Sequence, residues 1–437
     1  MLHSDGLSEI LQSYNPWWQT GTFAIPGYPC RRSLQQVALE HVQEEPRRAL
    51  LIRGPRQVGK TVLLLQVAED LLRAGFPASR LLYFRFDDER LPAGVSLRTI
   101  LSRFEPADET HPVVCLLDEL TGAEEWSRGL KLAVDRGGYR VLATDSSARL
   151  LRLGRQESGV GRWDELEMET LTFREALTFQ ARPGETPESV LRRSSGVLYR
   201  FLRAGGFPEH LLSEDLRRVD ERLRSDVSDR VIGRDLIGYD VARVQRLFAY
   251  LARTSGGLVS YAGLAGELEA DQRSVKDWIG ALIQSMLTFP LERLATRASQ
   301  SLRERRKLYV ADPGLVCAFS TAPDPLASGE VLGRALETLV FRELRELCRR
   351  EGGQLSFYRD AKGQEVDFVW DGPRGVALLE VGSRYRAEKA ARLDSLRAKL
   401  KARVACQLHP GPLRDGPRSR TLEELFLAPD SLWEGAP

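Results

Sequence analysis

Residues 49–61 carry the clearest chemical signal of the chain, an apolar stretch that runs into the pattern G-x-x-x-x-G-K-T. In such a pattern the glycines let backbone N–H groups turn inward around a β-phosphate, while the lysine reaches the β- and γ-phosphates and the threonine hydroxyl can ligate Mg²⁺. A helix predicted over 62–72 would add a favourable dipole for the anion. The alternative is a glycine-rich strand-to-helix turn with an incidental Lys-Thr pair. The residues expected to contact ATP are Gly54, Gln57, Val58, Gly59, Lys60, Thr61 and Val62.

A second candidate lies downstream, where an apolar run from Pro112 ends in the two acids Asp118 and Glu119. Asp118 would hold Mg²⁺ through water, together with the hydroxyl of Thr61, and Glu119 would polarise the attacking water. A hydrolysing site needs both a charge clamp and a water-orienting carboxylate. An acidic pair at a strand end can also be a solvated turn, but its place downstream of a P-loop favours the catalytic interpretation.

A third apolar run, over 141–146, ends in Thr144, Asp145 and Ser146. At that position a polar residue such as Thr144 could sense a γ-phosphate or help to place the water. The alternative is a helix N-cap, because Ser146 and Ser147 precede an apolar helix predicted over 148–153. The two interpretations are compatible.

The elements that must position these groups are short apolar strands alternating with helices. Strands are predicted over 81–87, 112–119 and 141–146, which is typical of a parallel α/β sheet. With 437 residues the chain is expected to form about three domains.

Composition excludes several classes of protein. A net charge of +2 exerts no strong global attraction on nucleic acid, so any basic site must be local. The five cysteines are scattered without a C-x-x-C pattern, which indicates neither a disulfide framework nor a zinc ribbon. No apolar run reaches the length of a membrane span and the N-terminus has no basic n-region, so we expect no membrane contact and a cytoplasmic protein.

Several segments together resemble an AAA-type ATPase family found widely in bacteria and archaea, in which a C-terminal domain of long-uncertain function follows the ATPase. The segments that carry the resemblance are GPRQVGKT (54–61), VVCLLDE (113–119), TDSSARLL (144–151), Gly161-Arg162, Asn15-Pro16-Trp17-Trp18, Leu171-Thr172-Phe173-Arg174-Glu175, Gly205-Gly206-Phe207-Pro208-Glu209 and Asp312-Pro313-Gly314-Leu315.

The resemblance implies a role for Arg162, as an arginine that meets phosphate either in its own chain or from a neighbouring subunit. The alternative is a surface arginine among many. The chain departs from the family at Asp145, where the family usually has glycine after the sensor threonine. An extra acid near a γ-phosphate could repel it.

The middle of the chain reads as helical over 187–240 and then as a winged helix-turn-helix. Its predicted elements are helices over 241–254, 260–268 and 272–284 and strands over 288–294 and 307–311. The wing is lined or flanked by Arg297, Arg303, Arg305, Arg306 and Lys307, which in a DNA-binding module would meet phosphates. The helix predicted over 272–284 is the expected recognition helix. It carries few cations beside its acids, so its base-reading face is poor. Nucleic-acid contact and a lid or protein-contact role both remain open.

The C-terminal region, with a helix over 333–350 and strands over 355–359, 365–370 and 376–381, resembles the restriction-endonuclease-like fold. The resemblance implies that Glu337, Asp367 and Glu380 hold Mg²⁺, while a lysine would stabilise the developing phosphorane charge. The lysine position holds Gly382, which supplies no charge. Lys389 on the following helix could reach back. That helix, predicted over 386–403, is basic and either holds a nucleic-acid backbone or presents a solvated face.

The sequence therefore predicts an α/β protein with a P-loop AAA-type domain and N-terminal extension (1–180), a helical connector with a winged helix (187–312) and a restriction-endonuclease-like domain (325–437). The expected function is ATP-driven switching, coupled to nucleic acid or to a protein partner, with a degenerate nuclease-like domain. The alternatives are an ATP-gated, metal-dependent DNA nuclease and a signalling ATPase that never touches nucleic acid. Candidate partners are DNA, through the winged helix and the C-terminal domain, and further copies of the chain.

Overall fold

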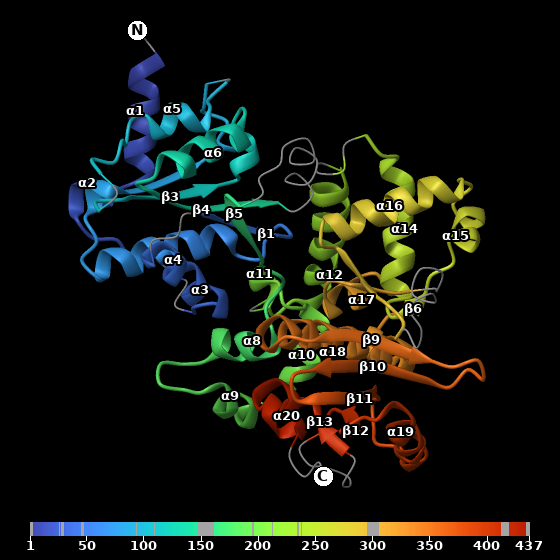
Figure 1. The fold of residues 1–437 in the computed structure, drawn as a ribbon. Coiled ribbons are helices and arrows are strands. Elements are labelled where there is room, and N and C mark those ends of the chain that lie inside the picture. Colours follow the sequence, from blue (N-terminus) through green and yellow to red (C-terminus); the bar gives the residue numbers. More distant parts are fainter. Residues whose placement is uncertain are drawn as a thin grey trace. The chain divides into compact units, whose positions relative to one another are not determined.

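The chain forms two compact units, Met1–Glu169 and Thr170–Pro437 (Figure 1). The computed structural model describes residues 3–25, 27, 30–44, 48–92, 94–108, 110–146, 161–194, 196–211, 213–233, 236, 238–294, 306–411 and 419–433.

The first unit contains the predicted parallel sheet with helices on both faces. Its elements in chain order are α1 (His3–Tyr14), α2 (Trp17–Thr20), α3 (Ser33–Gln43), β1 (Ala49–Gly54), α4 (Lys60–Arg73), η1 (Ala78–Arg80), β2 (Leu81–Arg85), α5 (Leu97–Leu101), β3 (Val113–Asp118), η2 (Leu120–Gly122), α6 (Trp126–Arg136), β4 (Tyr139–Ser146) and β5 (Trp163–Glu167).

All five strands of this sheet run parallel, in the order β2-β3-β4-β1-β5. The chain leaves β1 toward the edge strand β2, whereas it leaves β4 toward β5 on the other side. The direction of the connections therefore reverses between β1 and β4, where Gly54 lies opposite Ser146. In open α/β sheets ligands bind in the crevice outside the carboxyl ends of the strands at such a switch point.

The core of the first unit explains why its strands are apolar along their whole length. β3 is buried at every residue from Val113 to Asp118. Helices α1, α5 and α6 contribute to a hydrophobic cluster against one face of the sheet, and α3 and α4 contact the other face (Figure 1). Cys115 is a fully buried thiol, as expected from its place in this strand, and burial raises its pKa.

The segment Asn15-Pro16-Trp17-Trp18 covers the free edge of β2. The Asn15 side chain donates to the Tyr83 carbonyl at 2.9 Å and accepts from the Tyr83 N–H at 2.7 Å. Both indole N–H groups, of Trp17 and Trp18, donate to the Leu81 carbonyl, at 3.0 and 2.9 Å. These side chains occupy backbone groups that an unprotected edge strand would offer to another chain, so this part of the resemblance has a structural role.

The second unit contains two sheets among helices. Its elements in chain order are α8 (Phe173–Gln180), α9 (Pro187–Arg193), α10 (Val197–Ala204), α11 (Pro208–Leu211), α12 (Leu216–Ser225), η3 (Asp226–Ile232), α14 (Val241–Arg253), β6 (Gly257–Leu258), α15 (Tyr261–Glu267), α16 (Gln272–Gln284), β7 (Thr288–Leu291), β8 (Lys307–Val310), α17 (Pro313–Ala318), η4 (Pro325–Ala327), α18 (Gly329–Glu351), β9 (Gln354–Arg359), β10 (Glu365–Gly372), β11 (Gly375–Val381), α19 (Ala387–Leu400), β12 (Val404–His409), β13 (Ser419–Thr421), α20 (Leu422–Leu427) and η5 (Pro429–Trp433).

The smaller sheet is antiparallel in the order β6-β8-β7, and the larger one is mixed in the order β13-β12-β11-β10-β9. β7 ends at Leu291, three residues before the predicted end, because the chain changes its partner there. The Leu294 N–H donates to the Phe357 carbonyl of β9 at 2.7 Å, and the Phe357 N–H donates to the Glu292 carbonyl at 3.0 Å. Strands β6, β12 and β13 were not predicted. The wing residues Arg297, Arg303 and Arg305 and the helix predicted over 148–153 lie outside the described residues.

Three segments of the resemblance meet inside the second unit. The carboxylate of Asp312 accepts from the N–H groups of Gly206 and Gly314, both at 2.8 Å. The Leu171 N–H donates to the Gly206 carbonyl at 2.8 Å. A side chain at Gly205 would not fit, since its Cβ would lie 2.0 Å from Asp312 Oδ1. These matches therefore describe one packed junction.

Within the described residues, no helix combines the length and the apolar character that crossing a bilayer requires.

Candidate functional site

The loop between β1 and α4 has the backbone conformation that its sequence demands. Gln57 and Gly59 adopt left-handed conformations, with φ of 65° and 98°. Gly54 is required for a different reason, because a Cβ at that position would lie 2.1 Å from the Met168 carbonyl oxygen. The first glycine thus lets the residue after β5 approach β1, and the second lets the loop turn into α4.

Lys60 begins α4 with its ammonium turned back into this loop. Its Nζ donates to the carbonyl oxygens of Gly54 and Pro55, at 2.9 and 2.7 Å, and only 6% of the residue is exposed. Burial lowers the pKa of Lys60, against the opposing charges of Glu119, Asp118 and Asp145. A buried ammonium held by loop carbonyls fits the polyphosphate of a nucleotide, whose oxygens can take the place of those acceptors.

Asp118 is the centre of the hydrogen-bond network at the end of β3. Its Oδ2 accepts from Thr61 Oγ1 at 2.7 Å and from the Tyr83 hydroxyl at 3.0 Å, and its Oδ1 accepts from Thr144 Oγ1. The structure therefore brings the predicted residues Thr61, Asp118 and Thr144 together. The two groups predicted to serve Mg²⁺ are in direct contact, so the donor set fits that ion.

Tyr83 is a member of this network that the sequence analysis missed. Its side chain is buried, and burial followed by the charge of Asp118 raises its pKa. The available signal was a tyrosine with a polar tip inside the otherwise apolar strand β2, which pairs with β3. A buried tyrosine hydroxyl needs a partner, and the neighbouring strand offers an acid.

Glu119 has a carboxylate without a protein partner for one of its oxygens. Its backbone is left-handed, with φ of 51°, and its N–H donates to Thr144 Oγ1 at 3.4 Å. Among the described residues nothing donates to its buried Oε2. Burial raises the pKa of Glu119 to about 7. An uncommitted carboxylate beside the P-loop lysine fits the predicted water-orienting role.

The carboxylate of Asp145 accepts a hydrogen bond from the backbone that follows Glu119. It is fully buried, and its Oδ2 accepts from the Thr121 N–H at 2.5 Å. Burial raises the pKa of Asp145 to about 6, against the lowering effect of the hydrogen bond from Thr121. The acid that departs from the family pattern therefore fixes the turn η2.

Arg162 lies at the opposite end of the sheet from the P-loop. Its carbonyl accepts from the N–H of Ala49, the first residue of β1, and its guanidinium donates to Asp135 Oδ1 at 2.9 Å. The length of β1, at ~3.3 Å per residue, places it roughly 16 Å from Gly54. This placement does not support the predicted contact between Arg162 and a phosphate bound to its own chain. Action on a neighbouring subunit stays a prediction.

Arg32 is a second contributor to the loop that no pattern pointed to. It precedes α3 and donates to the carbonyls of Val58 and Glu169, both at 3.1 Å. Its guanidinium thereby ties the P-loop to the end of the first unit.

The second predicted site contains a lysine among its acids. Glu337 lies on α18, Asp367 on β10 and Glu380 on β11, as the resemblance implied. Yet within the described ranges no three residues of the types His, Cys, Asp and Glu are placed to hold a metal ion. The ammonium of Lys307 instead lies against Glu337 and Asp367. The expected Mg²⁺ ligand set of Glu337, Asp367 and Glu380 stays a prediction, to which the structure adds a buried lysine beside two of these acids.

Glu380 has cationic partners of its own. Lys389 Nζ and Arg392 Nη2 lie 2.8 and 2.7 Å from its Oε1, so Lys389 does reach back from α19. A Cβ at Gly382, the position of the missing lysine, would lie 2.7 Å from Nε2 of Gln407, so a larger residue there requires that side-chain end to shift.

Several cations of the basic helix α19 contact neighbouring groups of the same unit. Lys399 donates to the Tyr358 hydroxyl at 2.6 Å, and Arg397 donates to the Ala402 carbonyl at 3.3 Å. Its apolar residues, Leu393 and Leu396, are buried against the sheet. These contacts favour the structural interpretation of α19 over a nucleic-acid surface.

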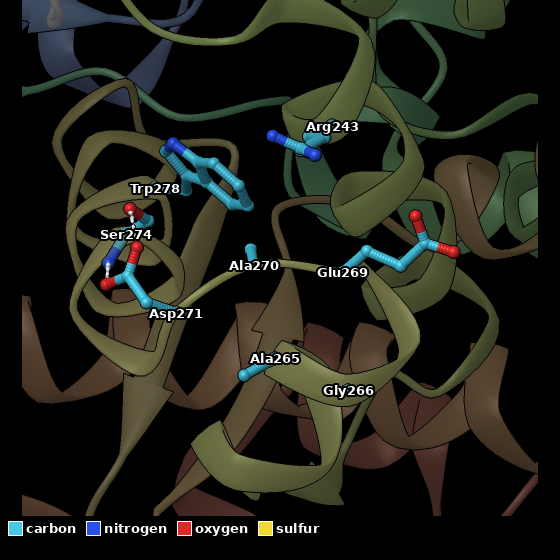
Figure 2. Close-up of a pocket in the computed structure, with 8 residues that line it drawn as sticks. All are labelled: Arg243, Ala265, Gly266, Glu269, Ala270, Asp271, Ser274 and Trp278. Carbon is cyan, nitrogen blue, oxygen red and sulfur yellow. Dashed lines mark hydrogen bonds between the residues drawn. The ribbon is translucent and has the colours of Figure 1, made fainter.

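A hollow of ≈ 500 Å³ lies at the turn between α15 and α16. Figure 2 shows Arg243, Glu269 and Trp278 around it, with Asp271 hydrogen-bonded to Ser274. Asp271 is the N-cap of α16, so its charge is used locally. One arginine beside two acids offers little attraction to a phosphate backbone, which agrees with the poor base-reading face that the sequence predicted.

Comparison with known families assigns the first part of the chain. Residues 46–177 match the family model described as AAA domain, and residues 196–325 and 332–416 match two models described as domains of unknown function, DUF8612 and DUF4143. Together with the parallel sheet and the P-loop, the first match identifies a P-loop ATPase domain of the AAA type in this segment.

Three similar proteins extend over more of the chain. An uncharacterized protein of Methanocaldococcus jannaschii is 24% identical over 386 residues, 82% of this chain and 80% of its own. One of Haemophilus influenzae is 21% identical, over 61% of this chain and 67% of its own. One of Mycobacterium tuberculosis is 26% identical, over 73% and 66%.

Two solved structures are similar at low TM-scores. The ORC1 protein of Aeropyrum pernix in complex with DNA is 14% identical with a TM-score of 0.29, covering 69% of this chain and 96% of that one. AMPPCP-bound DnaA of Aquifex aeolicus is 18% identical with a TM-score of 0.24, covering 62% and 92%. At these scores neither carries an argument about the function of this chain.

Proposed function

We propose that the protein is an ATP-binding and ATP-hydrolysing switch. The observation that carries the proposal is the network around Asp118, which holds Thr61 of the P-loop and Thr144 of the neighbouring strand on one carboxylate. A change in the contacts between this network and a bound phosphate would affect α4, β3 and β4 together. Such a linkage is what a switch between nucleotide states requires.

The chain's own residues divide the work of hydrolysis. When bound, ATP with Mg²⁺ supplies the phosphoryl group and the charge that neutralises it. The backbone N–H groups of the P-loop cradle the phosphates, and Lys60 exchanges its loop carbonyls for phosphate oxygens. Glu119 orients the attacking water, while Thr144 holds the Asp118 carboxylate and the Glu119 N–H. Arg162 is proposed to act on the site of another copy, because it lies far from its own.

The switch is proposed to act on a partner through the rest of the chain. Residues 187–312 would form a helical connector and a winged helix, and residues 325–437 a restriction-endonuclease-like domain that has lost its cleavage chemistry. The loss is supported by Gly382, which supplies no charge at the lysine position. The partner is nucleic acid or a protein. Weak base-reading charge on α16 favours a contact that does not depend on sequence.

The proposal is tested by measuring ATP turnover with and without plain duplex DNA, at low and high salt, and by checking the DNA for cuts with Mg²⁺ and Mn²⁺. We expect Mg²⁺-dependent turnover and no cleavage. Salt-sensitive stimulation by DNA would identify nucleic acid as the partner. Robust cutting that is abolished by Asp367→Ala would contradict the loss of cleavage. Gly382→Lys should introduce cutting if the acids remain correctly placed and the end of the Gln407 side chain shifts to admit the lysine.

Turnover is also expected to depend on pH through Glu119. Only the ionised carboxylate can attract a proton from water, and the pKa of Glu119 is raised to about 7 by burial. The active fraction therefore increases as pH rises from 6 to 8, so the rate at saturating ATP should increase over that range. A steady-state pH profile measures this. A flat profile would mean that ionisation of Glu119 does not limit the rate.

A further inference from the structure

Lys307 is a buried cation from the small sheet that lies among the acids of the large one. It is the first residue of β8, and only 3% of it is exposed. Its Nζ lies 2.7 Å from Glu365 Oε1, 3.3 Å from Glu337 Oε1 and 3.8 Å from Asp367 Oδ1. The sequence predicted that Lys307 lines or flanks a wing, with nucleic-acid contact and a lid or protein-contact role both open, whereas the structure turns its side chain inward.

The charges around Lys307 compensate for its burial. Burial alone lowers its pKa, but the carboxylates of Glu337, Asp367 and Glu365 outweigh that effect, and the net pKa is raised. Burial, and then the charges of Glu337 and Glu380, raise the pKa of Asp367. The ammonium of Lys307 lies between acids that converge from α18 and β10, where its charge opposes their mutual repulsion.

The small sheet also packs against Glu337, whose side chain is 20% exposed. The Tyr309 hydroxyl donates to Glu337 Oε1 at 2.6 Å, and a Cβ at Gly256 would lie 2.9 Å from the same oxygen. A divalent ion such as Mg²⁺ needs near-octahedral oxygen ligands at about 2.0–2.1 Å and keeps several waters. Lys307 and Tyr309 both contact Glu337 Oε1, so a divalent ion would have to compete with them for this carboxylate.

The same centre joins two sheets. The ring of Tyr309 stacks on Phe341 of α18 at a centroid distance of 4.1 Å. Ser255 Oγ, which accepts from the Val310 N–H at 3.2 Å, lies 2.8 Å from Thr338 Oγ1 of α18. Lys307 thus lies at the polar centre of a buried contact between β8 and α18.

We propose that the acidic centre of the C-terminal sheet is an internal ion-pair lock, in which the ammonium of Lys307 takes the place of a divalent cation and fastens the small sheet to α18 and β10. The lock excludes metal from the acids that the nuclease-like fold would use for cleavage. It rests on the nuclease-like interpretation of 325–437 but is independent of ATP hydrolysis.

The test measures Mn²⁺ binding to the full chain by calorimetry, without nucleotide or DNA. In the wild type we expect no saturable Mn²⁺ binding at these acids. Asp367→Asn should therefore leave the Mn²⁺ binding of the chain unchanged. Lys307→Met keeps the length of the side chain but removes its charge, so its Mn²⁺ affinity should be at least tenfold higher than that of the wild type. Adding Asp367→Asn to Lys307→Met should abolish the gain. Lys307→Met should have a lower melting temperature than the wild type, because it removes one partner of a buried ion pair. Adding Mn²⁺ should raise the melting temperature of this variant.

Lys399→Met is the matched control, because Lys399 is a cation of the same unit that contacts Tyr358 and Asp360 away from this centre. It should leave Mn²⁺ binding unchanged. A folded Lys307→Met chain that binds no additional Mn²⁺ would overturn the proposal. If that variant does not fold, the wild type and Asp367→Asn still decide: wild-type binding that Asp367→Asn removes refutes the lock, and its absence supports it. The failure of ATP turnover would leave these results untouched.

Discussion

Lys60→Ala is expected to lower the affinity for ATP at least tenfold, which corresponds to about 1.4 kcal/mol or more of binding free energy. The reason is that Lys60 is the buried ammonium of the P-loop, with Nζ 2.9 and 2.7 Å from the carbonyls of Gly54 and Pro55. In the complex that charge faces a polyphosphate in a site of low dielectric, where it cannot be replaced by water. Titration calorimetry with ATP and Mg²⁺ measures the loss.

Two further variants separate charge from loop structure. Lys60→Met retains the aliphatic stem and should lose affinity like Lys60→Ala. Arg73→Ala, at the far end of α4, removes an exposed cation that pairs with Glu69 and Asp70, and should leave ATP affinity unchanged. Unchanged affinity in both Lys60 variants, with unfolding midpoints like that of the wild type, would refute the P-loop assignment.

Glu119→Gln is expected to bind ATP normally and to turn it over about 10²–10⁴-fold more slowly, the range typical of a lost general base. The amide keeps the shape of the side chain in its left-handed turn but cannot attract a proton from water. The buried Oε2 has no protein donor among the described residues, so the substitution breaks no internal hydrogen bond at that oxygen. Single-turnover hydrolysis, compared with equilibrium ATP binding, distinguishes a loss of chemistry from a loss of affinity.

Glu125→Gln is the matched control, because Glu125 is an exposed carboxylate whose ion pair with Arg128 is 3.6 Å long. Its turnover should equal that of the wild type. Any residual rate of Glu119→Gln should also lose the rise between pH 6 and pH 8. If Glu119→Gln turns over ATP at a near-normal rate, another residue must orient the water.

The arrangement of the P-loop and of the acidic strand end could be predicted because its parts are local, while the nucleotide-binding roles of these residues stay a prediction. The glycines, Lys60 and Thr61 stand next to one another in the chain, and their conformation follows from φ preferences and from the strand and helix that flank them. Asp118 and Glu119 are recognised by the apolar strand before them. Parallel pairing then brings the carboxyl ends of β1, β3 and β4 to one edge, which a pattern of alternating strands and helices already implies.

Groups that meet through packing could not be predicted. Tyr83 reaches Asp118 because β2 happens to pair with β3, and Arg32 reaches the P-loop from a segment with no pattern of its own. The resemblance implied that Arg162 meets a phosphate, but this residue precedes β5 and so lies at the end of the sheet away from the P-loop.

The C-terminal centre shows the same division between sequence and tertiary structure. The sequence by itself placed Glu337, Asp367 and Glu380 on the right elements, since amphipathic helices and buried strands have recognisable periods. It also determined that Gly382 supplies no charge. Only the tertiary structure decided where the positive charge comes from: Lys307, 60 residues before Asp367 and expected to line or flank the wing, turns inward on β8. A strand pattern fixes the alternation of side chains, but the face that is buried depends on the neighbour against which the sheet packs, and that neighbour is α18.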